Sequence, residues 1–149
     1  ENVEAKGYNY VTNFRDVLGE ADYVCIHVPK RPETENLIST EEFKMMRETA
    51  YVINVSRGGI VNEPALVCAL KEGLIAGAAL DVFELEPPNL ENPLLKLNNI
   101  VVSPHCGAFT KECARRMAIA CARAVLNAFE GRFDPQLVVN KETLLDKMQ

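Results

Sequence analysis

The chain has 149 residues, of which 48% are hydrophobic and 25% are charged, and its formal net charge is −5. This is the composition of an ordinary globular protein with a hydrophobic core, and it excludes a fibre or a disordered chain. The absence of a basic stripe argues against nucleic acid as a partner, and no apolar run is long enough to predict a membrane span.

Five cysteines are present, and no two of them form a C-x-x-C pair. An odd number of cysteines without a paired spacing predicts reduced thiols and a cytoplasmic location. The two histidines, His27 and His105, stand far apart in the sequence and lack the spacing of metal ligands, so we expect no metal site.

The first half of the chain alternates helical and strand patterns. Residues 13–18 predict a short helix, and the apolar run 21–28 predicts a strand. Ser39 and Glu42 have the spacing of a capping box and predict the start of the next helix, which precedes a second apolar run at residues 50–55. The runs are continuously apolar, which is typical of strands covered on both faces of a parallel sheet.

The second half continues the alternation. Asn62 can cap a helix that ends at Glu72, and the apolar runs 75–82 and 100–103 predict two more strands. A longer helix is predicted from residue 111 to about residue 130, with small and apolar residues on one face. That face fits either core packing or a dimer contact. The repeated strand–helix–strand units, with right-handed crossovers, predict an α/β fold with a doubly wound parallel sheet.

Polar residues and glycines follow the predicted strands at their carboxyl ends, where open parallel sheets bind ligands. They are His27 in the first run, Ser56, Arg57, Gly58 and Gly59 after the second, Asp81 and Glu86 after the third, and His105, Cys106 and Gly107 after the fourth. Because these carboxyl ends meet at one edge of the sheet, we expect the residues to lie together and to form a ligand site.

The chemistry of this edge allows more than one interpretation. Arg57 offers a planar guanidinium that matches a carboxylate with two hydrogen bonds, but it also fits an arginine that pairs with a local acid. Glu86 and His105 suit an acid–base pair, because a carboxylate favours the imidazolium form; singly, they fit a solvated loop acid and a histidine held in a turn. Asp81 ends an apolar strand, so we expect it to accept hydrogen bonds from backbone or ligand amides.

Four segments together resemble the D-isomer-specific 2-hydroxyacid dehydrogenases. They are residues 27–38 (HVPKRPETENLI), 53–66 (INVSRGGIVNEPAL), 76–88 (AGAALDVFELEPP) and 92–107 (NPLLKLNNIVVSPHCG). The resemblance implies an NAD(P)-dependent oxidoreductase, a homodimer in its parent form, that interconverts a small 2-oxo acid and its D-2-hydroxy acid. Glyoxylate, hydroxypyruvate and phosphohydroxypyruvate are the candidate substrates that it suggests.

The resemblance also implies roles for individual residues. Arg57 would bind and polarise the 2-oxo acid, His105 would be the acid/base, and Glu86 would tune the histidine. Asp81 corresponds to the residue that anchors the nicotinamide carboxamide. The implied residues for binding NAD or NADP are Val28, Pro29, Val55, Ser56, Arg57, Asp81, His105, Cys106 and Gly107. Glu86 stands where formate dehydrogenases carry glutamine, which argues against formate as the substrate.

One feature expected from the resemblance lies outside this chain. The eight glycines nowhere form the G-x-G-x-x-G fingerprint that holds a pyrophosphate. We therefore expect residues 1–149 to be the C-terminal portion of a dinucleotide-binding domain, a partial Rossmann-like fold lacking its first strand–helix–strand. Residues 132–149 would be a tail that packs on a missing substrate domain, and the chain alone would be inactive. The alternative is a non-enzymatic, dinucleotide-sensing or corepressor-like binding module.

Overall fold

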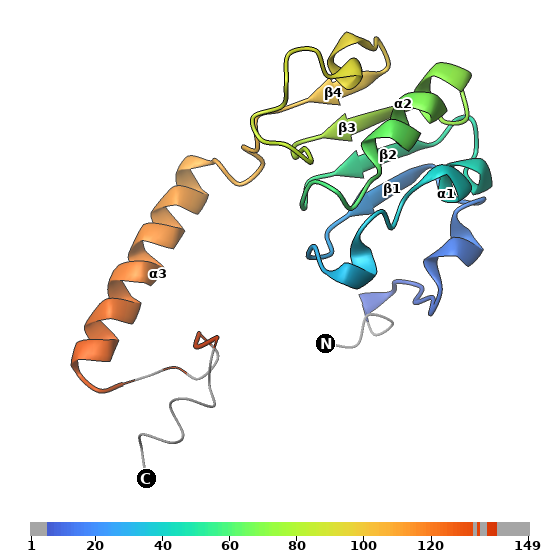
Figure 1. Cartoon of the computed structure of the whole chain (residues 1–149). Coiled ribbons are helices and arrows are strands. Elements are labelled where there is room, and N and C mark those ends of the chain that lie inside the picture. The colour runs from blue at the N-terminus through green and yellow to red at the C-terminus, as the bar shows by residue number, and fades with distance from the viewer. Residues whose placement is uncertain (1–5, 133, 135–136, 140–149) are drawn as a thin grey trace. The chain divides into compact units, whose positions relative to one another are not determined.

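The computed structural model describes residues 6–132, 134 and 137–139, and the chain divides into two compact units, Glu1–Gly107 and Ala108–Gln149 (Figure 1). The first unit contains all the strands of the described residues. Its elements are η2 (Phe14–Val17), β1 (Tyr23–Ile26), η3 (Pro32–Thr34), α1 (Thr40–Met45), β2 (Tyr51–Asn54), α2 (Glu63–Glu72), β3 (Gly77–Leu80), η4 (Pro93–Lys96) and β4 (Ile100–Val102).

The four strands form one parallel sheet in the order β1-β2-β3-β4. The expected α/β parallel sheet is therefore confirmed, and the carboxyl ends of all four strands lie at the same edge. Each strand is shorter than the apolar run that predicted it. The runs 21–28 and 75–82, for example, contain only the four-residue strands Tyr23–Ile26 and Gly77–Leu80. The remaining residues of these runs lead into loops, which bring the candidate site residues to the edge.

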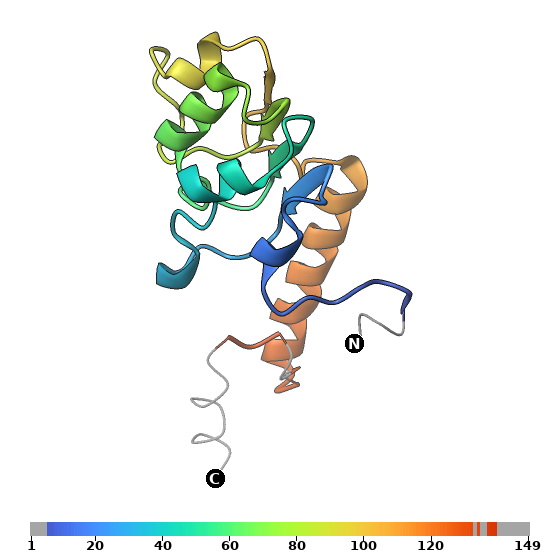
Figure 2. The same ribbon diagram turned by 90° about the vertical axis from the view of Figure 1, so that its right-hand side faces the viewer.

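Helices α1 and α2 lie on one face of the sheet (Figures 1 and 2). The face of α2 that carries Ala65, Leu66, Ala69 and Leu70 is buried, as the spacing of these residues along a helix predicts. Phe43, Val52, Ile60, Leu66 and Leu94 are completely buried at the centre of the core. Burial of each such side chain stabilises the fold by roughly 1.5–3 kcal/mol.

The opposite face of the sheet is exposed. Tyr23 and Tyr51 stack with their ring centroids 5.7 Å apart, and Val101 follows on β4 with 70% of its surface exposed. Neither α1 nor α2 covers this face in the described part of Glu1–Gly107, so the covering of the second face stays a prediction. A continuous apolar run shows that both faces of a strand are apolar, but it does not supply the element that covers the second face.

The helix ends agree closely with their sequence signals. The capping box of Ser39 and Glu42 opens α1, and the Asn62 side chain accepts a hydrogen bond from the Ala65 N–H at 2.8 Å to open α2. Gly73 ends α2 in the left-handed conformation, with φ = 71°. The helix predicted at residues 13–18 is a single 3₁₀ turn, Phe14–Val17.

The second unit contains the helix α3 (Lys111–Phe129), as predicted. The Thr110 side chain accepts a hydrogen bond from the Cys113 N–H at 3.1 Å, and Gly131 beyond the helix end has φ = 69°. No residue of α3 is buried, so the role of its apolar face stays a prediction. Within the described ranges, no helix is both long and apolar enough to cross a membrane. Most of the predicted tail, residues 132–149, lies outside the described residues.

Candidate active site

The loops at the carboxyl ends of the strands are joined to one another in strand order. The Ser56 hydroxyl, after β2, donates to the carbonyl of Val28, after β1. Asp81, after β3, donates its N–H to the Asn54 carbonyl at 3.0 Å, and His105, after β4, donates its N–H to the Asp81 carbonyl at 2.8 Å. The candidate residues therefore share one hydrogen-bonded edge.

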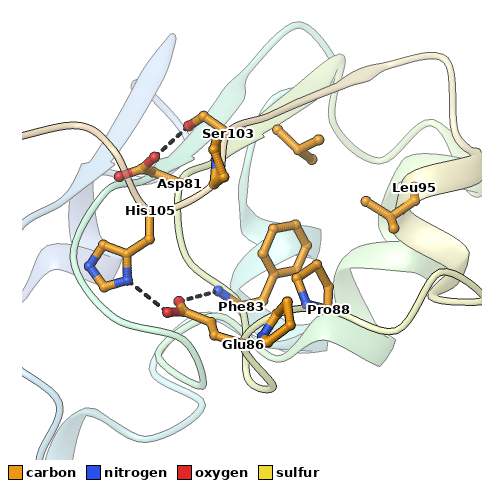
Figure 3. A pocket seen from close by; sticks show the side chains of 10 residues that line it. Asp81, Phe83, Glu86, Pro88, Leu95, Ser103 and His105 are labelled. Carbon is orange, nitrogen blue, oxygen red and sulfur yellow. Dashed lines mark hydrogen bonds and ion pairs between the residues drawn. The ribbon is translucent and has the colours of Figure 1, made fainter. Parts of the chain in front are cut away.

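The side chains of His105 and Glu86 are hydrogen-bonded to each other at this edge (Figure 3). The imidazole Nδ1 lies 2.7 Å from the Glu86 Oε2, and the second carboxylate oxygen, Oε1, accepts the Phe83 N–H at 3.0 Å. With both oxygens engaged, the carboxylate has a fixed orientation. It also fixes the imidazole ring, because Nδ1 is held and Nε2 makes no hydrogen bond to another described residue.

The charges around Glu86 favour its ionised form. The hydrogen bond from His105 is the largest influence that lowers the pKa of the Glu86 carboxyl, followed by the hydrogen bond from the Phe83 N–H. The positive charges of His105 and Arg57 lower this pKa further, against the effect of desolvation. Arg57 therefore lies close enough to Glu86 to act on it electrostatically, although the two side chains form no ion pair within the described structure.

The backbone of His105 is in the left-handed region, with φ = 52°. A residue other than glycine adopts this conformation at a cost of roughly 1–3 kcal/mol, so the surrounding contacts must hold it there. Asp81 supplies them. Its carbonyl accepts the His105 N–H, and its carboxylate accepts the backbone N–H groups of Cys106 and Gly107, each at 2.8 Å.

Asp81 is only 5% exposed, and the hydrogen bonds around its carboxylate favour the ionised form. The hydrogen bond from the Ser103 hydroxyl, at 2.5 Å, is the main cause that lowers the pKa of the Asp81 carboxyl. The N–H groups of Gly107 and Cys106 and the charge of His105 lower this pKa as well, and they outweigh the burial that would raise it. The predicted hydrogen bonds from backbone amides are thus confirmed.

Arg57 is held at the end of β2 by a residue that the sequence analysis did not select. The buried side chain of Asn54 accepts the Ser56 N–H at 3.1 Å and donates to the Arg57 carbonyl at 3.0 Å. Arg57 donates from Nη1 to the Ser56 carbonyl at 2.6 Å, and its side chain is exposed. A polar amide inside the apolar run 50–55 was the available signal, since a buried amide needs hydrogen-bond partners.

The loop of Arg57 packs directly on the loop of Glu86. A Cβ atom at Gly58 would lie 1.8 Å from the carbonyl oxygen of Phe83, so only glycine fits between these two backbones. Gly59 has φ = 79°, and a Cβ atom there would lie 2.6 Å from Nζ of Lys30, a second basic residue that the sequence analysis did not select. The paired glycines after Arg57 thus allow a close approach of neighbouring protein groups.

The candidate residues are divided between two cavities. One, of about 500 Å³, is mostly apolar and is lined by Asp81, Phe83, Glu86, Pro87, Pro88, Leu95, Val102, Ser103, Pro104 and His105 (Figure 3). The other, of about 480 Å³, is lined by His27, Pro29, Lys30, Val55, Ser56 and Arg57. Glu86 and His105 are in direct contact, whereas Arg57 reaches them through electrostatics and the packing of the two loops. Val28, Cys106 and Gly107 line neither cavity.

The residues at this edge fit a nicotinamide group. From the described residues, Asp81 Oδ2 accepts one hydrogen bond, that of the Gly107 N–H, and so retains a lone pair for an amide donor. A Cβ atom at Gly107 would lie 3.0 Å from that oxygen, so the glycine keeps it accessible. Val28 and Val55 present apolar surfaces that are 38% and 42% exposed. Among the described residues, no three His, Cys, Asp or Glu side chains are grouped as metal ligands.

Comparison with known proteins identifies the family. Residues 1–107 match the model of the D-isomer specific 2-hydroxyacid dehydrogenase, NAD binding domain. The glyoxylate reductase of Thermofilum pendens is 48% identical over 133 residues, which are 89% of this chain and 39% of that protein. The glyoxylate reductase of Aeropyrum pernix is 44% identical over 132 residues, again 39% of its length. The chain thus spans less than half the length of these relatives.

Solved structures agree with the sequence matches. The NAD complexed form of a D-isomer specific 2-hydroxyacid dehydrogenase from Lactobacillus delbrueckii ssp. bulgaricus has a TM-score of 0.84 and 34% identity, over 93% of this chain and 46% of that one. The enzyme of the same description from Xanthobacter autotrophicus Py2, in complex with NADPH and MES, has a TM-score of 0.69 and 33% identity, over 82% and 52%. The chain therefore belongs to the family of D-isomer specific 2-hydroxyacid dehydrogenases.

Proposed function

We propose that this chain is the C-terminal portion of the dinucleotide-binding domain of an oxidoreductase that interconverts a small 2-oxo acid and its D-2-hydroxy acid. The observation that carries the proposal is the His105–Glu86 pair, 2.7 Å between Nδ1 and Oε2, at the sheet edge that also bears Arg57. No observation favours the alternative of a non-enzymatic sensing module. Such a module would not require the His105–Glu86 pair.

His105 is the acid and base of the reaction. Since Nδ1 is held by Glu86, Nε2 is the atom that faces the substrate, and the protonated ring donates its Nε2 proton to the carbonyl oxygen during reduction. In the reverse direction the neutral ring accepts the hydroxyl proton at the same atom. The ionised Glu86 stabilises the imidazolium between these steps, as the lowered pKa of its carboxyl requires.

Arg57 binds the carboxylate of the 2-oxo acid. Its guanidinium is exposed at the sheet edge, and within the described part of the chain its only hydrogen bond runs from Nη1 to the Ser56 carbonyl, which leaves the other N–H groups for a ligand. A guanidinium can hold a carboxylate through two parallel hydrogen bonds, which fixes the position of the neighbouring carbonyl group. Positioning of this kind contributes to the rate because it replaces a random encounter by one geometry.

The cofactor is NAD or NADP, which supplies or accepts the hydride. Asp81 would accept a hydrogen bond from the carboxamide, and Val28, Val55 and Gly107 would line the nicotinamide ring. Pro29, Ser56 and Cys106 complete the proposed binding residues. A phosphate-binding glycine loop and a substrate domain would come from other parts of the full-length protein, as would the surface on which residues 132–149 pack.

Small 2-oxo acids are the proposed substrates, with glyoxylate first, because relatives at 44–48% identity are named glyoxylate reductases. A homodimer is the proposed assembly of the full-length protein. The five cysteines are free thiols, which supports a reducing compartment such as the cytoplasm.

Kinetics of the purified full-length protein test the proposal. Oxidation of NADH and of NADPH is followed at saturating glyoxylate and hydroxypyruvate. We expect turnover with one of these acids, and we expect His105→Asn to lower kcat by roughly 10²–10⁴-fold, the usual contribution of a general acid. A full-length protein that binds dinucleotide but reduces no 2-oxo acid would overturn the proposal in favour of a sensing module.

A further inference from the structure

Glu86 sits in a segment without regular secondary structure, residues 81–92, between β3 and η4. Inside this segment it contacts Phe83, and beyond it His105, at the distances given above. A side chain on an irregular loop is held in a productive position only when the loop is fixed by outside contacts. Besides His105 itself, the described structure shows one residue outside the loop that provides such contacts at two points.

That residue is Glu63, the first residue of α2. Its Oε1 accepts the Glu84 N–H at 2.6 Å, and its Oε2 accepts a hydrogen bond from the Asn92 side-chain amide at 2.9 Å. Glu84 returns the contact, because its Oε1 accepts the Glu63 N–H at 3.3 Å. One carboxylate therefore bridges residues 84 and 92, the two sides of the turn that presents Glu86.

Glu63 stands on a rigid support. Leu66, Ala69 and Leu70 on the inner face of α2 are buried in the core. Asn62, the residue before Glu63, caps the helix. The same helix begins four residues after Gly59, at the end of the Arg57 loop. The amino end of α2 is thus fixed to the core and joined to both loops that carry the proposed catalytic residues.

We propose that Glu63 is a positioning residue for the Glu86–His105 pair, an inference that rests on the function proposed above. Glu63 has no contact with His105, and it acts by holding Glu84 and Asn92, and through them the position of Glu86 Oε2 against Nδ1. Loss of this bridge would weaken the hydrogen bond between Glu86 and His105. The imidazolium would then be stabilised less, while the binding of substrate and dinucleotide would be unchanged.

Glu63→Gln in the full-length protein tests the inference. The glutamine keeps the length and one acceptor oxygen, but its NH₂ group cannot accept a hydrogen bond from Asn92. We expect kcat to fall by about tenfold, since small misplacements remote from the chemistry have effects of this size or larger. We also expect KM for the 2-oxo acid and for the dinucleotide to stay within about twofold, and the alkaline limb of the pH–rate profile to move to lower pH.

Two further variants separate positioning from general effects. Glu63 and Glu91 both line a third cavity, so Glu91→Gln removes the same charge from the same surroundings. Within the described structure the Glu91 carboxylate pairs only with Lys96, so the kcat and pH profile of E91Q should equal those of the wild type. The double variant E63Q/N92D reverses donor and acceptor across the bridge, because the introduced carboxylate can accept from the glutamine amide. We expect it to recover most of the lost kcat.

A measurement on the 149-residue chain does not depend on turnover. The Nδ1–H resonance of His105 should be visible and shifted downfield by the hydrogen bond to Glu86 in the wild type and in E91Q, and broadened by solvent exchange in E63Q. If E63Q does not fold, the single variant Asn92→Asp takes its place, because its carboxylate can still accept the Leu94 N–H but has no donor for Glu63.

The outcomes separate the two proposals. Equal kcat values for E63Q and E91Q overturn the inference about Glu63, and so does a lower kcat of E63Q with an unaltered His105 resonance. If the resonance is lost in E63Q but the full-length wild type reduces no 2-oxo acid, the proposed function fails while the anchoring of the pair by Glu63 stands.

Discussion

The buried carboxylate of Asp81 accepts hydrogen bonds from the Ser103 hydroxyl and from the N–H groups of Cys106 and Gly107. These contacts hold the segment in which His105 adopts a left-handed backbone. A charge of this kind is tolerated in the interior because every donor around it points at the carboxylate. The same side chain therefore serves the fold and keeps the acid/base residue in place.

Replacement of Asp81 by Asn should reveal this role. An amide offers one acceptor oxygen, so its NH₂ group faces an N–H donor of Cys106 or Gly107 that is left without a partner. We expect a loss of roughly 1–3 kcal/mol in the free energy of unfolding, measured by urea denaturation of the 149-residue chain. Asp22→Asn, on an exposed carboxylate paired with Arg47, is the control and should cost less than about 0.5 kcal/mol. Equal losses for the two variants would contradict the assignment.

The pH dependence of stability follows from three carboxyl groups with lowered pKa values, Glu42, Asp81 and Glu86. For Glu42, burial is the largest single influence and raises the pKa, but the hydrogen bonds from Arg15, from the Ser39 N–H and from its own N–H, together with the charge of Arg15, outweigh it. In each case the unfolded state binds protons at a higher pH than the folded state, so stability increases with pH through this window. Their contribution is complete above the ordinary values of 3.8 to 4.5 and is lost as the pH falls through the lowered values.

We therefore expect the free energy of unfolding of the chain to change little from these groups between pH 6 and 8 and to fall steeply below about pH 4.5. Urea denaturation at a series of pH values measures this slope. Below pH 4, the free energy of unfolding of Asp81→Asn should depend less steeply on pH than that of the wild type. A slope that is unaltered in the variant would show that Asp81 is not among the groups that drive acid unfolding.

At the scale of elements, helix ends were predictable from the sequence and strand ends were not. Asn62 and Gly73 cap α2 through hydrogen bonds to residues three or four positions away. The local sequence is therefore sufficient to predict both ends of this helix. Strand length depends on pairing with residues far away in the chain, and the apolar run 75–82 therefore overestimated the strand Gly77–Leu80. Asn54 was missed for the same reason, because its partners become visible only when the loop of Arg57 has folded.

The packing of one loop on another is tested by Gly58→Ala. The added Cβ would lie 1.8 Å from the Phe83 carbonyl oxygen, so the Arg57 and Glu86 loops would have to move apart. We expect a loss of about 3 kcal/mol in the free energy of unfolding, at the upper end for overpacking. Gly73→Ala is the matched control, since it meets only the strain of φ = 71° and no atom within 4 Å, and should cost about 1 kcal/mol. A smaller loss for Gly58→Ala than for Gly73→Ala would contradict the described contact.

At the scale of the whole molecule, the candidate site residues share one edge of the sheet but are divided between two cavities. Residues from β2, β3 and β4 bring a guanidinium, a carboxylate and an imidazole to one edge of the sheet, as the order of the sequence motifs predicted. Which element covers the face with Tyr23, Tyr51 and Val101 stays a prediction, because an apolar run does not identify the covering element. The chain spans 39% of the length of the glyoxylate reductase of Thermofilum pendens, so a complete site is expected only in the full-length protein.

The 149-residue chain alone is therefore expected to bind NADH weakly and to show no measurable hydride transfer. None of its eight glycines forms the loop that would place backbone N–H groups on a pyrophosphate. Isothermal titration should give a Kd for NADH at least about 100-fold higher than that of the full-length protein, a difference of roughly 2.7 kcal/mol. Measurable reduction of glyoxylate by the isolated chain would contradict this prediction.

The central claim is that Arg57 and the His105–Glu86 pair act on one 2-oxo acid. A crystal structure of the full-length protein with NADH and oxamate, an unreactive analogue of such an acid, tests it most directly. The account predicts the oxamate carboxylate within hydrogen-bond distance of two Arg57 nitrogens and its carbonyl oxygen about 2.8 Å from His105 Nε2. Oxamate bound to only one of these two residues, or Arg57 paired with a protein carboxylate instead, would contradict it.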